Sequence, residues 1–168
     1  MHAQDPPVIH ADVKSGNILI DATGHTYICD FGLTKLGDAV TTMKGVGTLY
    51  WLSPERLDGG GWTRTAEDDV YAFGITIAEV SMSVPLLLHA GSSSSLSKVV
   101  LGRVPYDTFD GTDTDFKTGV MWRDVRPEGG SGPLWDLACK CWQHDPKLRP
   151  TMAEVTAELL SIVEKETN

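Results

Sequence analysis

The chain has few cysteines and few basic residues, and both shortages exclude classes of protein. Its three cysteines, Cys29, Cys139 and Cys141, are odd in number and irregular in spacing. This argues against a disulfide framework and fits a reducing compartment, so we expect a cytoplasmic protein. Its 14 basic residues stand against 23 acidic ones, for a net charge of −9. Nucleic acid and anionic membranes are polyanions, so neither is expected as the main partner.

Long apolar runs are also missing. The longest apolar region, residues 75–90, is interrupted by Glu79, two serines and Pro85, and it is therefore not expected to span a membrane. The opening residues MHAQDPP contain no apolar segment, so they are not expected to act as a secretory signal. The hydrophobic content of 41% and the charged content of 22% are ordinary for a soluble globular domain.

The first third of the chain predicts a β-hairpin followed by a loop. Residues 17–21 (NILID) and 26–29 (TYIC) are rich in strand-forming side chains, and a short loop containing Gly24 separates them. Residues 31–55 sustain neither a helical nor a strand period and contain several glycines and threonines. We expect a long ordered loop there, and loops of this length in compact domains are usually functional or disordered.

The rest of the chain predicts helices. Apolar side chains recur at helical spacing in three segments, at 70–80, 134–142 and 155–163. Thr65 precedes the first segment and Thr151 the last, each with an acidic residue three positions later, which is the spacing of a helix N-cap. The first helix is apolar most of the way round and is expected at the centre of the core. The second is expected to end at Asp145-Pro146. The predicted fold is mainly α with a small β-hairpin (α+β).

Polar groups flank the predicted hairpin in a pattern suited to phosphoryl transfer. Asn17 stands at the entrance of the first strand and Asp30 at the exit of the second, and these two ends of a hairpin lie side by side. An amide and a carboxylate supply the oxygen ligands that Mg²⁺ prefers. Asp12 is far enough from this pair to face an acceptor hydroxyl, and Lys14 would reach the transferred phosphate.

Five segments resemble, in order, the motifs of protein kinases. HADVKSGN (10–17) resembles the catalytic loop H-R-D-L-K-x-x-N, Asp30-Phe31-Gly32 resembles D-F-G, and LSPE (52–55) resembles A-P-E. Residues 69–74 (DVYAFG) resemble the start of the central buried helix, and residues 141–151 (CWQHDPKLRPT) resemble the end of the domain. The chain therefore resembles a eukaryotic-type protein kinase catalytic domain. The CW and RPT in the last segment are similar to the tyrosine-kinase-like group of Ser/Thr kinases.

The resemblance implies a role for each polar residue near the hairpin. Asp12 would be the catalytic base, Asn17 and Asp30 would hold Mg²⁺, and Lys14 would touch the γ-phosphate of ATP. Leu19, on the first strand, would pack under the adenine of ATP.

The same resemblance implies contacts that support the site. Thr48 would form a hydrogen bond near the catalytic base and lysine, and Asp69 would accept N–H groups from the catalytic loop. Two side-chain pairs are also implied, a stacked His10–Phe31 pair and a buried Glu55–Arg149 ion pair.

The implied activity is transfer of the ATP γ-phosphoryl group to Ser or Thr hydroxyls of protein substrates. Lys14 and the pattern GTLYW (47–51) favour serine and threonine over tyrosine as acceptors. One alternative is a small-molecule phosphotransferase of the aminoglycoside or choline type, which shares H-x-D-x-x-x-x-N but is disfavoured by Phe31-Gly32 and by residues 48–55. The other is a non-catalytic, pseudokinase-like interaction module, which the intact base and metal residues disfavour.

Two regions depart from the family pattern. Only nine residues precede His10, and they contain no Gly-rich loop or strand lysine to hold ATP. We therefore expect residues 1–168 to form the C-terminal lobe of the protein-kinase-like fold, with the N-terminal lobe absent and little activity. Residues 82–102, which include four consecutive serines, indicate an insertion. It would be either a surface loop or translated non-coding sequence.

A third departure is Ala11, which stands where the family has the arginine of H-R-D. That arginine normally pairs with a phosphate on the activation loop. Without it, phosphorylation at Thr41 or Thr42 would lack its usual partner. Replacing both threonines by alanine should therefore leave the transfer rate to a peptide within about threefold of wild type, less than about 1 kcal/mol in the barrier. A large loss of activity in the double variant would contradict this expectation.

Overall fold

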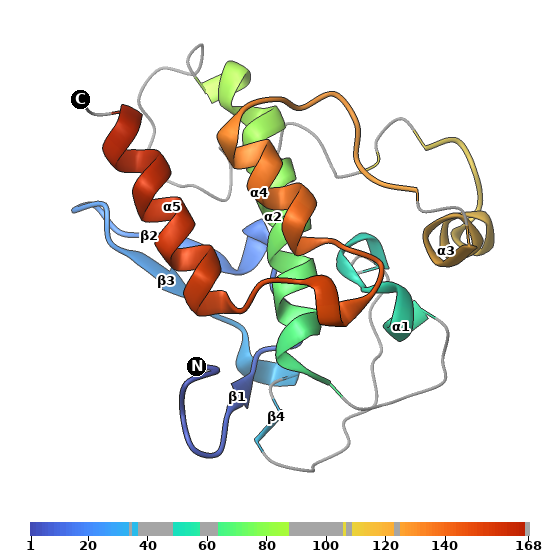
Figure 1. The fold of residues 1–168 in the computed structure, drawn as a ribbon, viewed down its shortest axis with the longest axis horizontal. Helices are drawn as coiled ribbons and strands as arrows, with labels where there is room; N and C mark the ends of the chain where they lie inside the picture. The colour runs from blue at the N-terminus through green and yellow to red at the C-terminus, as the bar shows by residue number, and fades with distance from the viewer. Residues whose placement is uncertain are drawn as a thin grey trace.

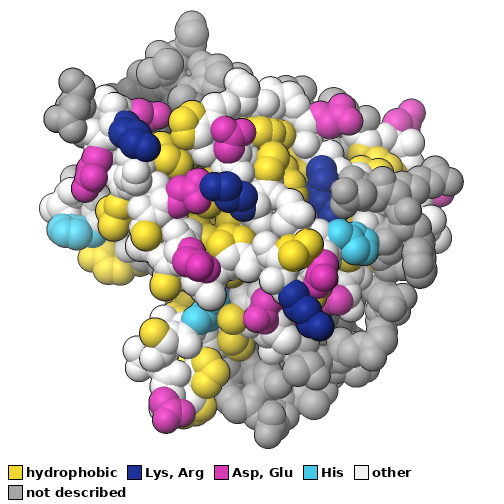
Figure 2. All heavy atoms as spheres, in the orientation of Figure 1, with side chains coloured by type: hydrophobic (Ala, Val, Ile, Leu, Met, Phe, Trp, Pro, Cys, Tyr) yellow, Lys and Arg dark blue, Asp and Glu magenta, His cyan; other side chains and the backbone are white. Residues whose placement is uncertain are grey.

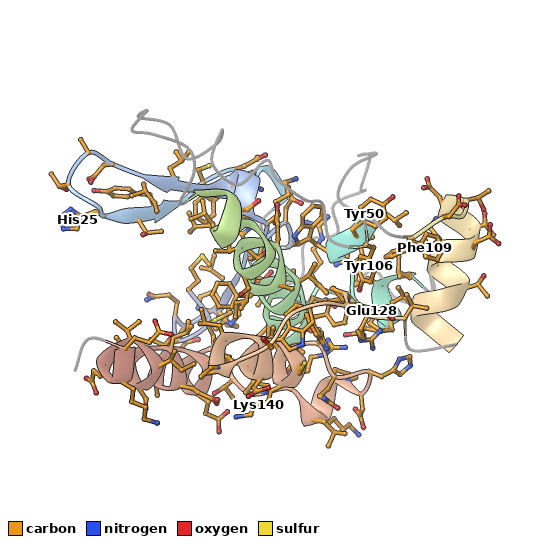
Figure 3. All side chains as sticks on the ribbon, turned by 90° about the horizontal axis from the view of Figure 1, so that it is seen from above. His25, Tyr50, Tyr106, Phe109, Glu128 and Lys140 are labelled. Atoms are coloured by element: carbon orange, nitrogen blue, oxygen red, sulfur yellow. The ribbon has the colours of Figure 1, made fainter. Side chains whose placement is uncertain are left out.

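The fold is a helical body with a hairpin on one side. The computed structural model describes residues 1–33, 35–36, 49–57, 64–87, 106, 109–122 and 125–166. Its elements are, in order, β1 (Val8–Ile9), η1 (Ser15–Asn17), β2 (Ile18–Ile20), β3 (Thr26–Ile28), η2 (Phe31–Leu33), β4 (Lys35–Leu36), η3 (Leu49–Trp51), α1 (Pro54–Leu57), α2 (Ala66–Leu87), α3 (Asp113–Trp122), α4 (Pro133–Cys141), η5 (Pro146–Leu148) and α5 (Met152–Glu166). Helix α2 lies in the middle, with α4 and α5 on one side and the β2–β3 hairpin on the other (Figures 1 and 3). The expected mainly α fold with a small hairpin is confirmed.

Helix α2 forms the centre of the core, as predicted. Its cap is the expected one, because the Thr65 N–H donates to the Asp68 carboxylate at 2.9 Å and the Asp68 N–H donates to the Thr65 hydroxyl at 3.3 Å. Tyr71 and Ile75 are completely buried, as expected for a helix that is apolar most of the way round. The helix continues to Leu87, so it takes in the first residues of the predicted insertion. The remainder of that insertion, residues 88–102, lies outside the described residues.

Helix α4 packs closely against α2 at a glycine. A Cβ atom added at Gly74 would lie 2.7 Å from the Cβ of Cys141 and 3.1 Å from the carbonyl oxygen of Ala138, so any larger residue would push the two helices apart. Burial raises the pKa of the Cys141 thiol to about 12, which makes it a packing group. The helix ends at Cys141, earlier than the predicted Asp145-Pro146, because the backbone of Trp142 already leaves the helical conformation.

Helix α5 begins with the capping box that the sequence predicts. The Thr151 N–H donates to the Glu154 carboxylate at 2.7 Å, and the Glu154 N–H donates to the Thr151 hydroxyl at 3.3 Å. Val155 and Ile162 are buried against the core, but Val163, predicted on the same side, is 54% exposed. One residue turns a helix by about 100°, which is enough to carry Val163 out of the contact.

The predicted hairpin is confirmed, with Ile18 of β2 opposite Ile28 of β3. Its turn is held by Asp21, whose carboxylate accepts the backbone N–H of His25 at 3.0 Å. Gly24 has a φ of 88°, which glycine adopts without strain. Figure 3 shows His25 at the hairpin tip, far from the helical body. The turn therefore fixes the register that brings the two ends of the hairpin together.

One strand of a second sheet, β4, lies inside the segment predicted to be a long loop. Strand β4 pairs antiparallel with β1, with Val8 opposite Leu36 and Ile9 opposite Lys35. Strands of two residues show no detectable period in the sequence, and their pairing depends on residues far apart in the chain. This pairing brings the segment after the hairpin back beside the segment before it.

Helix α3 was not predicted, and it is anchored by aromatic rings. The ring of Phe116 lies 4.8 Å from the ring of Tyr50, 4.8 Å from that of Tyr106 and 5.5 Å from that of Phe109, each edge to face. Figure 3 shows the labelled members of this cluster, Tyr50, Tyr106 and Phe109, beside α3. Edge-to-face pairs contribute beyond their buried area, so the cluster ties α3 to the short helix η3 through Tyr50.

The described surface carries charges of both signs. On the face shown in Figure 2, Lys and Arg side chains stand singly among acidic ones. One such pair is Lys140 with Glu158, at 2.7 Å. Among the described residues, no helix has the length and apolar content needed to cross a membrane.

The implied ion pair between Glu55 and Arg149 is present and joins distant parts of the chain. The guanidinium donates to both carboxylate oxygens, at 2.5 and 2.8 Å. Its remaining N–H groups reach the backbone carbonyls of Gln143, Glu67 and His144, so the buried charge is fully paired. Burial opposes ionisation of Glu55, but the hydrogen bonds and charge of Arg149 outweigh it and lower the pKa of that carboxyl.

Replacing Arg149 by methionine should destabilise the fold by about 3 kcal/mol, because it leaves a partly buried carboxylate and three carbonyls without their donor. The control is Lys140→Met, which breaks the exposed pair with Glu158 and should change stability by less than about 1 kcal/mol. Urea unfolding measures both. Since the Glu55 pKa is lowered, the pair's contribution is lost as pH falls through that pKa, and the Arg149→Met effect should shrink in acid. Equal losses of unfolding free energy in Arg149→Met and Lys140→Met would contradict the structural role assigned to the Glu55–Arg149 pair.

Candidate active site

The site is built on Asp69, at the start of α2. Its carboxylate is buried and accepts the backbone N–H of His10 at 2.8 Å and that of Ala11 at 2.7 Å. These are the contacts that the resemblance implies. Two N–H groups on one carboxylate fix both the position and the direction of the chain, so the loop that follows is held against the central helix.

Ala11 has a strained backbone, with a φ of 67°. This left-handed conformation costs an alanine about 1–2 kcal/mol. The bond from its N–H to Asp69 holds it in place. Strained residues of this kind cluster at functional sites.

Asp12 lies at the centre of a small polar cluster. Its Oδ2 atom accepts from the Lys14 ammonium at 2.7 Å and from the Asn17 amide at 3.0 Å, and the same amide donates to the Asp12 carbonyl at 2.8 Å. The other carboxylate oxygen, Oδ1, is buried and has no hydrogen-bond partner among the described residues. A buried oxygen with an unused lone pair is able to accept a proton from a hydroxyl placed beside it.

Asn17 and Asp30 are brought together by the hairpin. The N–H of Cys29 donates to the carbonyl of Asn17 at 2.8 Å, so Asp30 follows directly after the residue paired with Asn17. Asp30 is exposed, has a φ of 64°, and accepts the N–H of Gly32 at 3.4 Å. Since the amide nitrogen of Asn17 is used by Asp12, its oxygen is the atom left for a metal.

The donor set fits a hard cation that keeps most of its water. One amide oxygen and one carboxylate are the kind of ligands that Mg²⁺ takes beside phosphate oxygens. Within the described ranges, no group of three or more His, Cys, Asp or Glu side chains could hold a metal ion, so no softer metal site competes with it there.

The implied stacking of His10 and Phe31 is also present. Their ring centroids lie 4.9 Å apart at an angle of 61°, and the His10 Nε2 atom lies 3.0 Å from the carbonyl of Cys29. These contacts link the catalytic-loop segment to the segment after the hairpin. The role of His10 in this structure is therefore structural.

Leu19 lies on an exposed apolar face of the hairpin. It is 49% exposed, and Tyr27 on the neighbouring strand is 55% exposed. Because no described residue covers this face, it is accessible to a flat apolar ligand. Thr48, Thr41 and Thr42 lie outside the described residues, so the roles expected for them stay predictions.

The cavities do not enclose the polar cluster. A cavity of about 550 Å³ is lined by His2, Glu67, Arg149 and Met152, among others, and touches none of the residues around Asp12. The hollow that does reach Asp12 has a volume of about 20 Å³. The described structure therefore offers no nucleotide-sized hollow beside Asp12, and the side chains of Asp12 and Asn17 are buried.

Two contacts to the site were not expected from the sequence. The Nε2 atom of His2 lies 2.8 Å from the Asp69 carboxylate, and the Ser15 hydroxyl donates to Glu79 at 2.5 Å. A histidine near the chain start carries no pattern that marks it. Glu79, however, is an acidic residue within the predicted apolar segment, and that mismatch was a usable signal.

Comparison with known proteins agrees with this geometry. A family model described as the protein kinase domain matches residues 1–160. The chain is 35% identical over 152 residues to a probable serine/threonine-protein kinase of Dictyostelium discoideum, an alignment that covers 88% of this chain and 14% of the relative. It is 33% identical over 171 residues to the receptor-interacting serine/threonine-protein kinase 4 of Mus musculus, covering 98% and 20%.

A plant protein gives a similar match. The chain is 34% identical over 161 residues to phytosulfokine receptor 2 of Arabidopsis thaliana, with 92% of this chain and 15% of the relative covered. The chain thus spans a fifth or less of the length of these three relatives. Because the family model matches residues 1–160, which is nearly the whole chain, the chain belongs to the protein kinase family.

Proposed function

We propose that the chain is a serine/threonine kinase domain that transfers the γ-phosphoryl group of ATP to Ser or Thr hydroxyls of proteins. The observation that carries the proposal is the buried Oδ1 atom of Asp12, which has no partner among the described residues while Oδ2 is held by Lys14 and Asn17. The serine/threonine kinases among the similar proteins support the choice of acceptor. The CW and RPT segments support assignment to the tyrosine-kinase-like group.

In this proposal each residue of the polar cluster has one task. Asp12 orients the acceptor hydroxyl and takes its proton, and Lys14 leaves Asp12 to contact the transferred phosphate. Asn17 and Asp30 hold Mg²⁺, which neutralises charge on the phosphates when it is bound. Leu19 packs against the adenine, and Thr48 forms a hydrogen bond to the base and lysine.

We further propose that residues 1–168 form the C-terminal lobe of the kinase fold and bind ATP weakly on their own. The small volume of the hollow beside Asp12, about 20 Å³ among the described residues, supports this, because positioning and electrostatic stabilisation of a bound nucleotide supply most of the catalysis of phosphoryl transfer. The compartment expected from the free cysteines is the cytoplasm, and the partners are protein substrates, with nucleic acid and membranes disfavoured by the net charge of −9.

A second candidate function is a non-catalytic interaction module. The observation that favours it is a set of exposed apolar side chains, Leu19 and Tyr27 on the hairpin and Phe31 at the start of η2, which are each about half exposed. An apolar surface of this kind is typical of a site that binds another protein. The two candidates differ in whether the Asp12 carboxylate is required.

Asp12→Asn should lower phosphoryl transfer to a Ser/Thr peptide library by about a hundredfold or more, because the amide cannot take the hydroxyl proton. The matched control is Asp113→Asn at the exposed start of α3, which should leave the rate unchanged. The assay follows labelled phosphate from ATP with Mg²⁺, and a parallel arm offers aminoglycosides. Transfer to the aminoglycosides alone, or equal activity of wild type and Asp12→Asn, would reject the proposal.

ATP with Mg²⁺ should raise the melting temperature of the chain only slightly. With a dissociation constant near 1 mM, about 5 mM ATP stabilises the native state by about 1 kcal/mol, which corresponds to roughly 2–4 °C for a chain of this size. Asp30→Ala should remove the part of the shift that requires Mg²⁺, and ATP without Mg²⁺ serves as the control. A shift that is large, or that is the same with and without the metal, would contradict the assigned metal ligands.

A further inference from the structure

Glu79 is a buried carboxylate that the roles above do not use. It lies on α2, within the predicted apolar segment, and only 6% of its surface is exposed. Its Oε1 atom accepts a hydrogen bond of 2.5 Å from the hydroxyl of Ser15. A carboxylate in such a position is expensive to bury, so its presence in the core calls for an explanation.

Ser15 belongs to the segment that carries the proposed catalytic residues. It follows Lys14 directly and begins η1, which ends at Asn17. The Asn17 N–H donates to the Lys14 carbonyl at 3.0 Å and so closes this short helix. The bond to Glu79 is therefore a direct link from the central helix to the turn between the proposed phosphate-contacting lysine and the proposed metal-binding asparagine.

Glu79 also lies close to a second segment of the site. Trp51, the last residue of η3, is buried, and η3 packs against α2. Burial raises the pKa of Glu79, while hydrogen bonding to Ser15 opposes that rise. The helix that carries Glu79 thus contacts both the η1 turn and the segment that leads into the LSPE motif.

We propose that Glu79 is a positioning residue for phosphoryl transfer, which holds the η1 turn against α2 through the hydrogen bond that its Oε1 atom accepts from the Ser15 hydroxyl. This inference rests on the proposed kinase function and adds a residue to it. A hydrogen bond from a hydroxyl to a carboxylate is shorter and roughly twice as strong as one to the neutral amide of glutamine, and the bond from Ser15 measures 2.5 Å. This contact therefore requires glutamate at this position.

Stability and activity should respond in different ways to Glu79→Gln. Because burial raises the pKa of Glu79 in the folded chain, the stability contributed by this group is lost as pH rises through that pKa. The neutral glutamine should therefore melt at the same temperature as wild type or higher. A residue with a purely structural role would instead lower the melting temperature and the activity together.

The test uses the full chain in three measurements at neutral pH. For Glu79→Gln we expect no fall in melting temperature, roughly tenfold faster backbone hydrogen exchange over residues 14–17, and a roughly tenfold lower kcat for a Ser/Thr peptide with little change in KM. Ser15→Ala should accelerate exchange over the same residues. Glu158→Gln, which alters the exposed pair with Lys140 on α5, is the matched control and should change none of the three.

Each result decides the proposal. Unchanged exchange over residues 14–17 in Glu79→Gln would overturn it, whether or not the chain transfers phosphate. A higher KM with unchanged kcat would also overturn it, because Glu79 would then be a contact to the peptide. A wild-type chain that transfers no phosphate would reject the proposed function, while the exchange measurement would still report on the link between Glu79 and the η1 turn.

Discussion

The site depends on one buried carboxylate, Asp69, which holds the backbone of a distant loop. The backbone N–H groups of His10 and Ala11 both donate to it, and this anchor sets the direction of the loop residues that follow. A charge-assisted pair of this kind is stronger and more directional than a contact between neutral groups. Because Asp69 begins the most buried helix of the described structure, the anchor itself cannot move without disturbing the core.

Two buried acids on α2 thus hold the same loop at two points. Asp69 fixes its entry and Glu79, about 15 Å farther along the helix axis at 1.5 Å per residue, fixes the turn at Ser15. Between these points Asp12 keeps one oxygen bound to Lys14 and Asn17 and the other unused. The helix therefore fixes the positions of two points in a segment that has almost no regular structure of its own.

Much of the fold was predictable because its signals are local. Helical spacing and the Thr65 and Thr151 caps predicted α2 and α5, and β-forming residues around Gly24 predicted the hairpin. Helix α3 was missed although Thr112 and Asp115 form the same capping pattern there, with the Asp115 N–H donating to the Thr112 hydroxyl at 3.2 Å. Its polar sequence shows little apolar period, so only the cap could have revealed it.

The parts of the site that the sequence did not predict depend on contacts between distant segments. Three such contacts are the β1–β4 pairing, the His2–Asp69 contact and the Ser15–Glu79 bond. No sequence pattern links the residues that each of them joins. The order of the motifs predicted which residues would gather around the hairpin. That order did not predict that the amide nitrogen of Asn17 would donate to Asp12, because this hydrogen bond depends on the folded geometry.

The way Asp69 holds the loop also explains how an alanine can replace the arginine of H-R-D. The carboxylate recognises the main chain at position 11 and not the side chain, so the shape of the loop is insensitive to what evolution places there. The side chain at position 11 can therefore change without the loss of either backbone bond that anchors this segment to α2.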